Sequence, residues 1–449
     1  TTISAGTLSL SGSGSVSNSS VVILSGASGS TAIFDISVTT SGASIKSLGD
    51  GVSSGAYDSV TLGTKVLTLT AANDTFYGVI SSTSNAGGLT LSGGSETLAG
   101  SNTYTGATTI GGSAEVAEAT LYLVGSGSIA YSSGVVLTGW GNLDISGLTS
   151  GSGVPMLTIV TLSDTGDDNE VFLGSNNLTL SNASGTFHGV ISDGTADDAH
   201  GPTGGSVTLS AGTETFSGAN TYTGSTTVNG GTLTAGVSSV GSTSGAFGVG
   251  SAIVVNGGVV AIGSYDETVG SVTVGTSGGS ITGTTGVLTG TSYTFNNTSG
   301  LTVSAILGGS GVNLTQSGSG TSTLTGVNTY TGVTTINSGT LQLGNTSGTT
   351  LPTTSVISMS GGTLDLDGYN QTIGSISSTN SPVITNSGAS DAVLTIGGAS
   401  PGSFGGVIRD GNTNKTGLVL NSSSVTGTLT LSGANTYTGS TTVNGGTLT

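Results

Sequence analysis

Short stretches in which apolar and polar residues alternate run along the whole chain. In residues 428–433 leucine and threonine alternate, and in residues 440–449 single apolar residues flank a pair of glycines. A two-residue period with β-branched residues, bounded by Gly and Asn, is typical of short half-buried strands. Thr fills many polar positions, where it is a good strand former. We find no convincing helical periodicity, so the pattern predicts an all-β chain.

A five-residue tag, Asn-Thr-Tyr-Thr-Gly, recurs through the sequence. It occurs at residues 102–106, 220–224, 328–332 and 435–439. Each copy is followed by Thr-Thr-Ile or Thr-Thr-Val, and the chain opens on a further Thr-Thr-Ile. Repeats of this kind are the signature of stacked architectures. Measured between the Thr-Thr pairs, the sequence divides into four repeat units and the start of a fifth: 1–107, 108–225, 226–333, 334–440 and 441–449.

Several β architectures place short strands in a long repeat. A propeller blade takes roughly 40–50 residues and four strands, and a sandwich takes roughly 100 residues and seven strands. The aligned apolar positions near the end of the chain fall within about one 20-residue coil, which fits a right-handed parallel β-helix with coils roughly 4.8 Å apart. We therefore expect a β-solenoid of about 20 coils, with about five per repeat unit. An array of sandwiches is the alternative.

The Thr-Thr-Ile/Val segments also predict a register. If they occupy equivalent strand positions, each aliphatic residue points into the core and the Thr before it points outward. The inward set is Ile110, Val228, Ile336 and Val443, and the outward set is Thr109, Thr227, Thr335 and Thr442.

The composition limits the classes of partner. Only 6% of the 449 residues are charged, and 22 acidic residues oppose four basic ones, for a net charge of −18. This balance argues against nucleic acid and anionic membrane, which proteins bind through Lys and Arg clusters. The chain has no Cys, which fits secretion of a domain large enough to fold without disulfides. No apolar run approaches the roughly 18 residues of a membrane-spanning helix, so no membrane span is expected in this segment.

Residues 311–344, with related stretches at 207–236 and 418–449, resemble the autotransporter passenger-associated strand repeat. Residues 361–376 resemble segments of the same passengers. The resemblance implies a bacterial β-solenoid that is secreted or displayed at the outer membrane. Such solenoids often form stalks in adhesins and aggregation factors.

Two acidic stretches, residues 163–170 and 192–200, are the candidate metal site. Carboxylates on neighbouring coils could supply oxygen ligands to Ca²⁺. Their spacing matches neither the EF-hand loop nor the Gly-rich nonapeptide repeat. Solvated loops are the alternative, and no other cofactor is expected. The candidate ligands are Asp164, Asp167, Asp168, Glu170, Asp193, Asp197 and Asp198.

Neither histidine is expected to act in chemistry. His188 aligns with Tyr77 and Gly405 in other repeat units, and such variation within one molecule argues against a ligand or base. His200 lies in an acidic loop and is expected to be solvated.

No catalytic residue is expected. The comparison is with polysaccharide lyases, some of which are β-helical proteins. Those enzymes need carboxylate-bound Ca²⁺ and a basic residue. Here the clustered basic residues are Arg409 and Lys415, beside Asp410. A glycosidase-like carboxylate pair stays open, because two acidic loops could meet on a solenoid.

The aromatic residues have two interpretations each. The tag tyrosines could stack on sugars, but their identical placement favours a packing or turn role. Trp140, the single Trp, is either a surface anchor or a local plug. The tag tyrosines are Tyr104, Tyr222, Tyr330 and Tyr437.

The sequence therefore predicts a non-enzymatic extracellular or cell-surface protein, acting as a rigid stalk or adhesive surface. One alternative is a fibre subunit whose solenoid ends pair, because residues 441–449 repeat the pattern of residues 1–9. The other is a β-helix that binds or cleaves polysaccharide. The expected partners are further repeats or copies of the chain at the solenoid ends, surface glycans, and host or neighbouring-cell surfaces.

Overall fold

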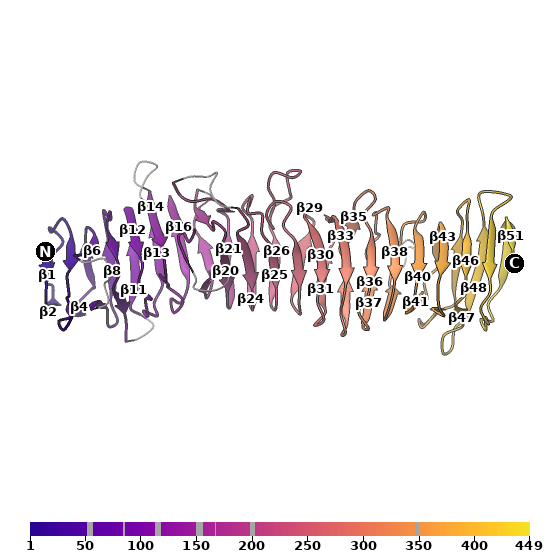
Figure 1. Ribbon diagram of the computed structural model, residues 1–449, viewed down its shortest axis with the longest axis horizontal. Coiled ribbons are helices and arrows are strands. Elements are labelled where there is room, and N and C mark those ends of the chain that lie inside the picture. Colours follow the sequence, from indigo (N-terminus) through magenta and orange to yellow (C-terminus); the bar gives the residue numbers. More distant parts are fainter. Residues whose placement is uncertain are drawn as a thin grey trace. The chain divides into compact units, whose positions relative to one another are not determined.

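The protein is an all-β parallel β-solenoid of about 19 turns (Figure 1). The computed structural model describes residues 1–51, 57–83, 86–112, 118–149, 156–166, 168–197, 203–345 and 350–449. Regular structure in these ranges consists of β-strands, which confirms the all-β prediction. Parallel ladders between successive turns exclude the array of antiparallel sandwiches. None of the described residues forms a helix with the length and hydropathy that a membrane crossing requires.

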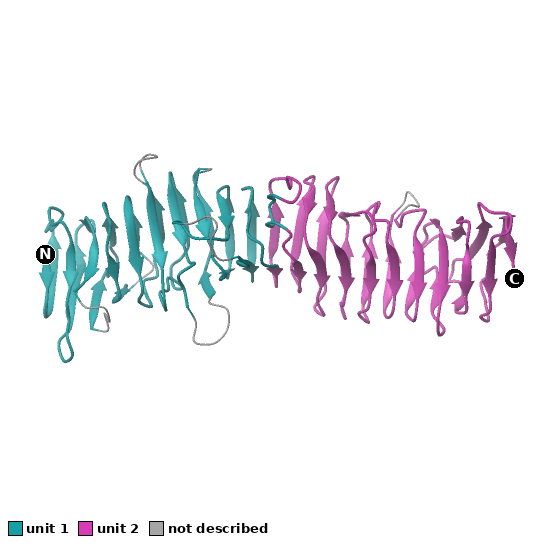
Figure 2. Cartoon of the chain, turned by 45° about the horizontal axis from the view of Figure 1, so that its top comes forward, with its two compact units in different colours: residues 1–226, 243–249 teal, residues 227–242, 250–449 magenta. Residues whose placement is uncertain are grey.

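The chain contains two compact units, coloured separately in Figure 2. Unit 1 comprises Thr1–Thr226 and Thr243–Val249, and unit 2 comprises Thr227–Ser242 and Gly250–Thr449. In each unit the chain winds into coils whose strands pair with those of the coils before and after. The coil length varies: Thr321 pairs with Thr340, 19 residues on, whereas Asn177 pairs with Ser206, 29 residues on.

The strands of unit 1 form several groups of parallel neighbours. The first two, in spatial order, are β1 (Thr2–Ile3), β3 (Val22–Leu24) and β6 (Leu48–Asp50), and then β10 (Val79–Ser81), β7 (Asp58–Thr61), β4 (Ala32–Thr39) and β2 (Gly6–Gly12). The third is β18 (Leu162–Asp164), β15 (Val135–Thr138), β13 (Thr108–Gly111), β11 (Gly88–Leu91), β8 (Val66–Leu69) and β5 (Ala43–Ile45). The fourth is β22 (Val190–Ser192), β19 (Glu170–Phe172), β16 (Gly141–Asp144), β14 (Ala119–Leu123), β12 (Gly94–Leu98) and β9 (Thr75–Phe76). The remaining groups are β17 (Met156–Ile159), β20 (Asn177–Leu180) and β23 (Ser206–Leu209), and the pair β21 (Ala183–Phe187) and β24 (Gly212–Phe216).

Unit 2 repeats the arrangement with longer ladders. The strand β25 (Thr226–Val228) contains residues of both units. One ladder is β27 (Ile253–Val255), β30 (Ser271–Val274), β33 (Ser292–Phe295), β36 (Leu314–Gln316), β38 (Val333–Ile336), β40 (Val356–Met359), β43 (Ser375–Ser378), β46 (Gly402–Phe404), β49 (Thr428–Leu431) and β51 (Thr447–Leu448). The second is β26 (Thr232–Ala235), β28 (Val259–Gly263), β31 (Gly279–Gly283), β34 (Leu301–Val303), β37 (Thr321–Leu324), β39 (Thr340–Leu343), β41 (Thr363–Asp365), β44 (Val383–Thr385) and β47 (Val407–Ile408). Two shorter ladders are β29 (Glu267–Thr268), β32 (Val287–Thr289) and β35 (Ile306–Gly308), and β42 (Gln371–Ile373), β45 (Ala392–Ile396), β48 (Thr416–Asn421) and β50 (Thr441–Gly445).

In-register pairing stacks the inward side chains of successive coils. Because strand side chains alternate between faces, a shift of one residue would turn a whole row outward. Gln316 is a polar member of one buried row, and its amide is satisfied by the carbonyl of Gly318 at 2.9 Å and the hydroxyl of Ser322 at 2.6 Å. The row comprises Val255, Val274, Phe295, Gln316, Ile336 and Met359.

The predicted register is correct for three of the four aliphatic positions. Ile110, Val228 and Ile336 are buried, and the Thr before each is only partly covered. Val443 is 47% exposed, so its predicted burial is wrong. It pairs with the buried Leu420 and thus keeps the inward register. Its strand, β50, is the terminal strand of its ladder in the structure.

Candidate functional site

The Asn of each tag joins neighbouring coils through hydrogen bonds. In all four tags its side-chain oxygen accepts a hydrogen bond from a backbone N–H of the preceding coil at 2.7–2.8 Å. Its amide also donates forward: Asn328 bonds the carbonyl of Thr350 at 2.8 Å and Asn220 bonds that of Ala246 at 2.7 Å. These bonds satisfy buried backbone groups where strand pairing is interrupted.

The Tyr of each tag packs in the same way in every repeat unit. Its hydroxyl lies 2.6–2.7 Å from the hydroxyl of the Thr four residues later in all four copies. Tyr104, Tyr222 and Tyr330 are fully buried, and burial raises the pKa of Tyr104 and Tyr330. A sugar cannot reach these three rings, so the packing interpretation is correct for them. Tyr437 is half-buried in the last coil.

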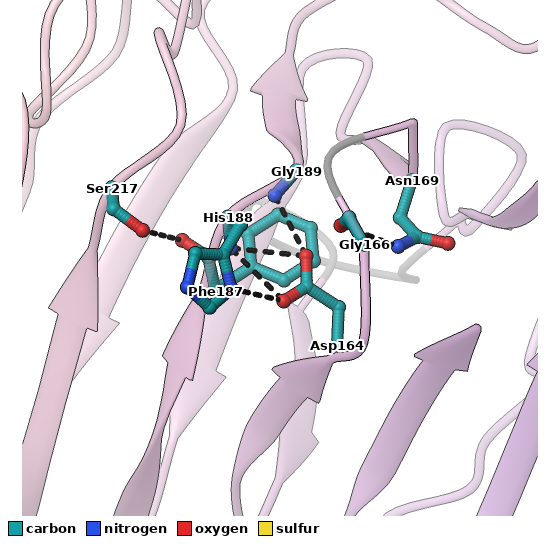
Figure 3. A network of polar contacts seen from close by, with 7 residues as sticks. All are labelled: Asp164, Gly166, Asn169, Phe187, His188, Gly189 and Ser217. Carbon is teal, nitrogen blue, oxygen red and sulfur yellow. Dashed lines mark hydrogen bonds and ion pairs between the residues drawn. The ribbon is translucent and has the colours of Figure 1, made fainter. Parts of the chain in front are cut away.

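Asp164 accepts several hydrogen bonds from one segment of the next coil (Figure 3). Its carboxylate accepts the backbone N–H of His188 at 3.0 Å and that of Gly189 at 2.7 Å, and it lies 2.8 Å from Nδ1 of the His188 ring. The Asp164 side chain is fully buried, whereas that of His188 is 47% exposed. The carboxylate is therefore used to hold the β21–β22 turn.

The same role recurs at other coils with different side chains. Asp50 accepts the backbone N–H groups of Tyr77 and Gly78, and the hydroxyl of Ser378 accepts the N–H of Gly405 at 2.7 Å. Because either a carboxylate or a hydroxyl can occupy this position, its shared role is to accept backbone N–H groups and so hold the backbone of the next coil. The recurrence supports the view that His188 occupies a structural turn position.

Asp193 is likewise an anchor for the tag. It accepts the hydroxyl of Thr223 at 2.6 Å and the N–H of Gly205 at 2.9 Å. Asp410 has the equivalent bond from the hydroxyl of Thr438, also at 2.6 Å.

The other predicted Ca²⁺ ligands fall in different places. Asp167 and Asp198, like His200, lie outside the described residues. Asp168 and Glu170 line a surface cleft, and Asp197 accepts a bond from the hydroxyl of Tyr122 at 3.2 Å. Within the described ranges, no three His, Cys, Asp or Glu side chains gather around a point that could hold a metal ion. The Ca²⁺ hypothesis stays a prediction.

The cleft lies on the outer face of the sheet formed by β14, β16, β19 and β22 in unit 1. Pairing aligns Asn142 with Glu170, and Glu170 with Val190, along one outward row. The residues beneath point inward and are buried, among them Leu143 and Val171. The cleft has a volume of about 430 Å³ and is lined by Glu118, Trp140, Asn142, Asp168, Glu170, Phe172, Val190 and Ala196.

The segment after β22 forms one wall of this cleft. The backbone N–H of Ala196 donates to Asp144 at 2.7 Å, and Asp197 accepts the hydroxyl of Tyr122. These two bonds attach the segment to β16 and β14. They explain why Asp144, on the outward face, is only 1% exposed.

The cleft is electrostatically negative. Burial and the neighbouring Glu118 raise the pKa of Glu170. Burial, then the carboxylates of Asp197, Asp144 and Glu118, raise the pKa of the Tyr122 hydroxyl to about 12. Lys and Arg are absent from the described lining. Asp168 and Glu170 were predicted from the acidic stretch in the sequence, but their position beside Trp140 and Asn142 was not.

The fold and these contacts define a repetitive parallel β-solenoid whose coils are joined by a recurring Asn-Tyr-Thr hydrogen-bond pattern. A family profile described as Passenger-associated-transport-repeat matches residues 205–235, 314–343 and 426–449. These three stretches are thus similar to the passenger-associated transport repeat, in agreement with the resemblance seen in the sequence. The tag at residues 102–106 has the same contacts outside the matched stretches. Searches of curated proteins and of solved structures find no match.

Proposed function

We propose that the chain is a non-catalytic segment of a bacterial protein carried outside the cell, where its solenoid serves as a stalk or adhesive surface. The observation that supports this is the recurrence of one inter-coil bonding pattern at Asn102, Asn220, Asn328 and Asn435. Repetition maintains a scaffold in which each repeat contacts its neighbours. The passenger-associated transport repeats support the location outside the cell.

A deletion within the repeat tests a distributed role. Removing residues 334–440 excises one sequence unit between equivalent points, so the flanking coils can stack again. Bacteria displaying the full chain and the shortened chain are compared for adhesion and cell aggregation. A scaffold or adhesive surface predicts a graded loss, and the deletion of residues 226–333 should give a similar loss. Complete loss from only one of the two deletions would contradict a distributed role.

A second experiment tests the absence of catalysis. The full chain is incubated with pectin, alginate and arabinoxylan in the presence of Ca²⁺, and release of product is measured. No turnover is expected. Turnover that disappears in the Asp168→Ala variant would overturn the non-catalytic proposal.

Self-association through the solenoid ends remains a prediction. Sedimentation of the full chain over a wide concentration range measures it directly. Reversible assembly that grows with concentration is expected, and a strictly monomeric chain would contradict it.

A further inference from the structure

We propose that the cleft over β14, β16, β19 and β22 binds an organic cation, a primary ammonium or guanidinium group on a slender stem. This inference concerns a local site and stands independently of the role proposed for the solenoid. It rests on uncompensated charge, a buried amide without a partner and an aromatic wall, all within one cleft.

The carboxylates of the cleft have no basic side chain of the chain beside them, so the cleft favours binding of a cationic ligand. Glu118, Asp168 and Glu170 line it, and the four basic residues of the chain, Lys46, Lys65, Arg409 and Lys415, do not. Burial, and then the like charge of Glu118, raise the pKa of Glu170. A bound ammonium or guanidinium group would relieve this repulsion and gain charge-assisted hydrogen bonds.

Asn142 supplies an observation independent of the acidic side chains. It is only 9% exposed and lines the cleft, yet its amide has no hydrogen-bond partner within the described part of the chain. The amide atoms are not among the fully buried unpaired atoms, so they stay open to the cleft and free to bond a ligand there. Its side-chain oxygen can accept an N–H from a ligand seated beside Glu170, its neighbour in register.

Trp140 lines the cleft and favours an organic cation over a metal ion. An indole face attracts an organic cation through its quadrupole, and Trp is the best aromatic for this contact. A bare Ca²⁺ ion instead needs about six to eight oxygen ligands, which the described side chains do not group to provide. The volume of about 430 Å³ suits a small ligand or one inserted side chain.

The intrinsic fluorescence of Trp140 reports binding directly, because it is the only Trp in the chain. The full chain is titrated with putrescine and with N-acetyl-arginine amide, and 1,4-butanediol serves as the uncharged match for putrescine. A saturable change with a cation, weakened by added salt, and none with the diol is expected. Tighter binding of putrescine indicates a free amine as the source, and tighter binding of the arginine amide indicates a protein side chain.

Matched variants locate the site. Glu170→Gln and Asn142→Leu should each weaken binding by about tenfold, while Asp391→Asn removes one charge in unit 2 and should leave it unchanged. Circular dichroism checks the fold, and if Asn142→Leu misfolds, the near-isosteric Glu170→Gln decides the question. The proposal is overturned if the diol or glucose binds as well as the cations, if Ca²⁺ displaces them, or if Glu170→Gln binds normally.

Discussion

Raising the pH is expected to destabilise the coil that contains Glu214. This side chain lies on β24 and is fully buried, and among the described residues its carboxylate has no well-formed hydrogen bond, only a weak contact with the backbone N–H of Gly185. Burial raises its pKa from the ordinary value of 4.5 to about 8. The repeat that contains residues 427–435 carries Leu429 at the matching position, so the site also suits an apolar side chain.

The direction of the pH effect on stability follows from which state of the protein, folded or unfolded, holds the Glu214 proton. Between pH 4.5 and about 8 the folded protein keeps the Glu214 proton and the unfolded chain releases it, so the free energy of unfolding falls as the pH rises. Each pH unit corresponds to about 1.36 kcal/mol, which gives a total loss of about 5 kcal/mol across this window. The stabilisation is fully present below pH 4.5 and is lost by about pH 8.

The assay compares the wild-type chain with Glu214→Gln, which keeps the size of the protonated side chain and cannot ionise. Because solenoid repeats open locally, hydrogen exchange is measured on peptides covering β21 and β24, from about pH 5 to about pH 9. Intrinsic exchange rates are corrected for pH. The two proteins should be equally protected at the acid end, and the variant should be better protected at the alkaline end.

Glu214→Leu provides a second check, and it should be insensitive to pH in the same peptides. Glu96, buried in the same way and also with a raised pKa, stays unchanged in all three proteins. Parallel protection profiles for wild type and Glu214→Gln across the whole range would refute the reasoning, since they would show that Glu214 does not retain its proton on folding.

Two further changes test the contacts that join the coils, each followed by urea unfolding. Asn220→Ala should lower the free energy of unfolding by about 1–3 kcal/mol for each buried backbone group left unpaired, because it removes the bonds to Ile191 and Ala246. Asn435→Ala removes a less buried Asn and should lower it less. Equal losses in the two variants would argue against the inter-coil role. Gly189→Ala should destabilise unit 1, because a Cβ there would lie 2.2 Å from a backbone oxygen. In the control variant Gly300→Ala the new Cβ meets nothing within 4 Å, so its effect should be neutral. An equal effect of both substitutions would show that backbone entropy, and not the close approach, is responsible.

The repeating parts of the structure were predictable from residue pattern. Alternation around Ile110, Val228 and Ile336 gave both the strands and the inward face, because strand side chains point to opposite faces in turn. The tag tyrosines were assigned to packing from their identical placement, and the structure gives that role its partner, the Thr four residues later. The local sequence pattern was sufficient to predict these features, because each repeating coil packs against coils of the same kind.

The cleft was not predictable in the same way. Glu118, Asn142 and Glu170 are 24 and 28 residues apart, and residues 111–175 depart from the repeat. Their alignment depends on the coil length, which loops change without changing strand pattern. The acidic stretch at 163–170 was noticed, but Asp164 turned out to bind backbone N–H groups while Glu170 faces a cleft.

The sequence by itself thus determined the strand period, the inward face and the repeating tag, since these are properties of neighbouring residues. Only the tertiary structure decided which outward side chains lie next to one another, because that depends on the number of residues in each coil. It also decided burial at Val443, which keeps its register but is 47% exposed on β50, the terminal strand of its ladder in the structure. Burial in a solenoid is supplied by the next coil, and no pattern within one strand contains that information.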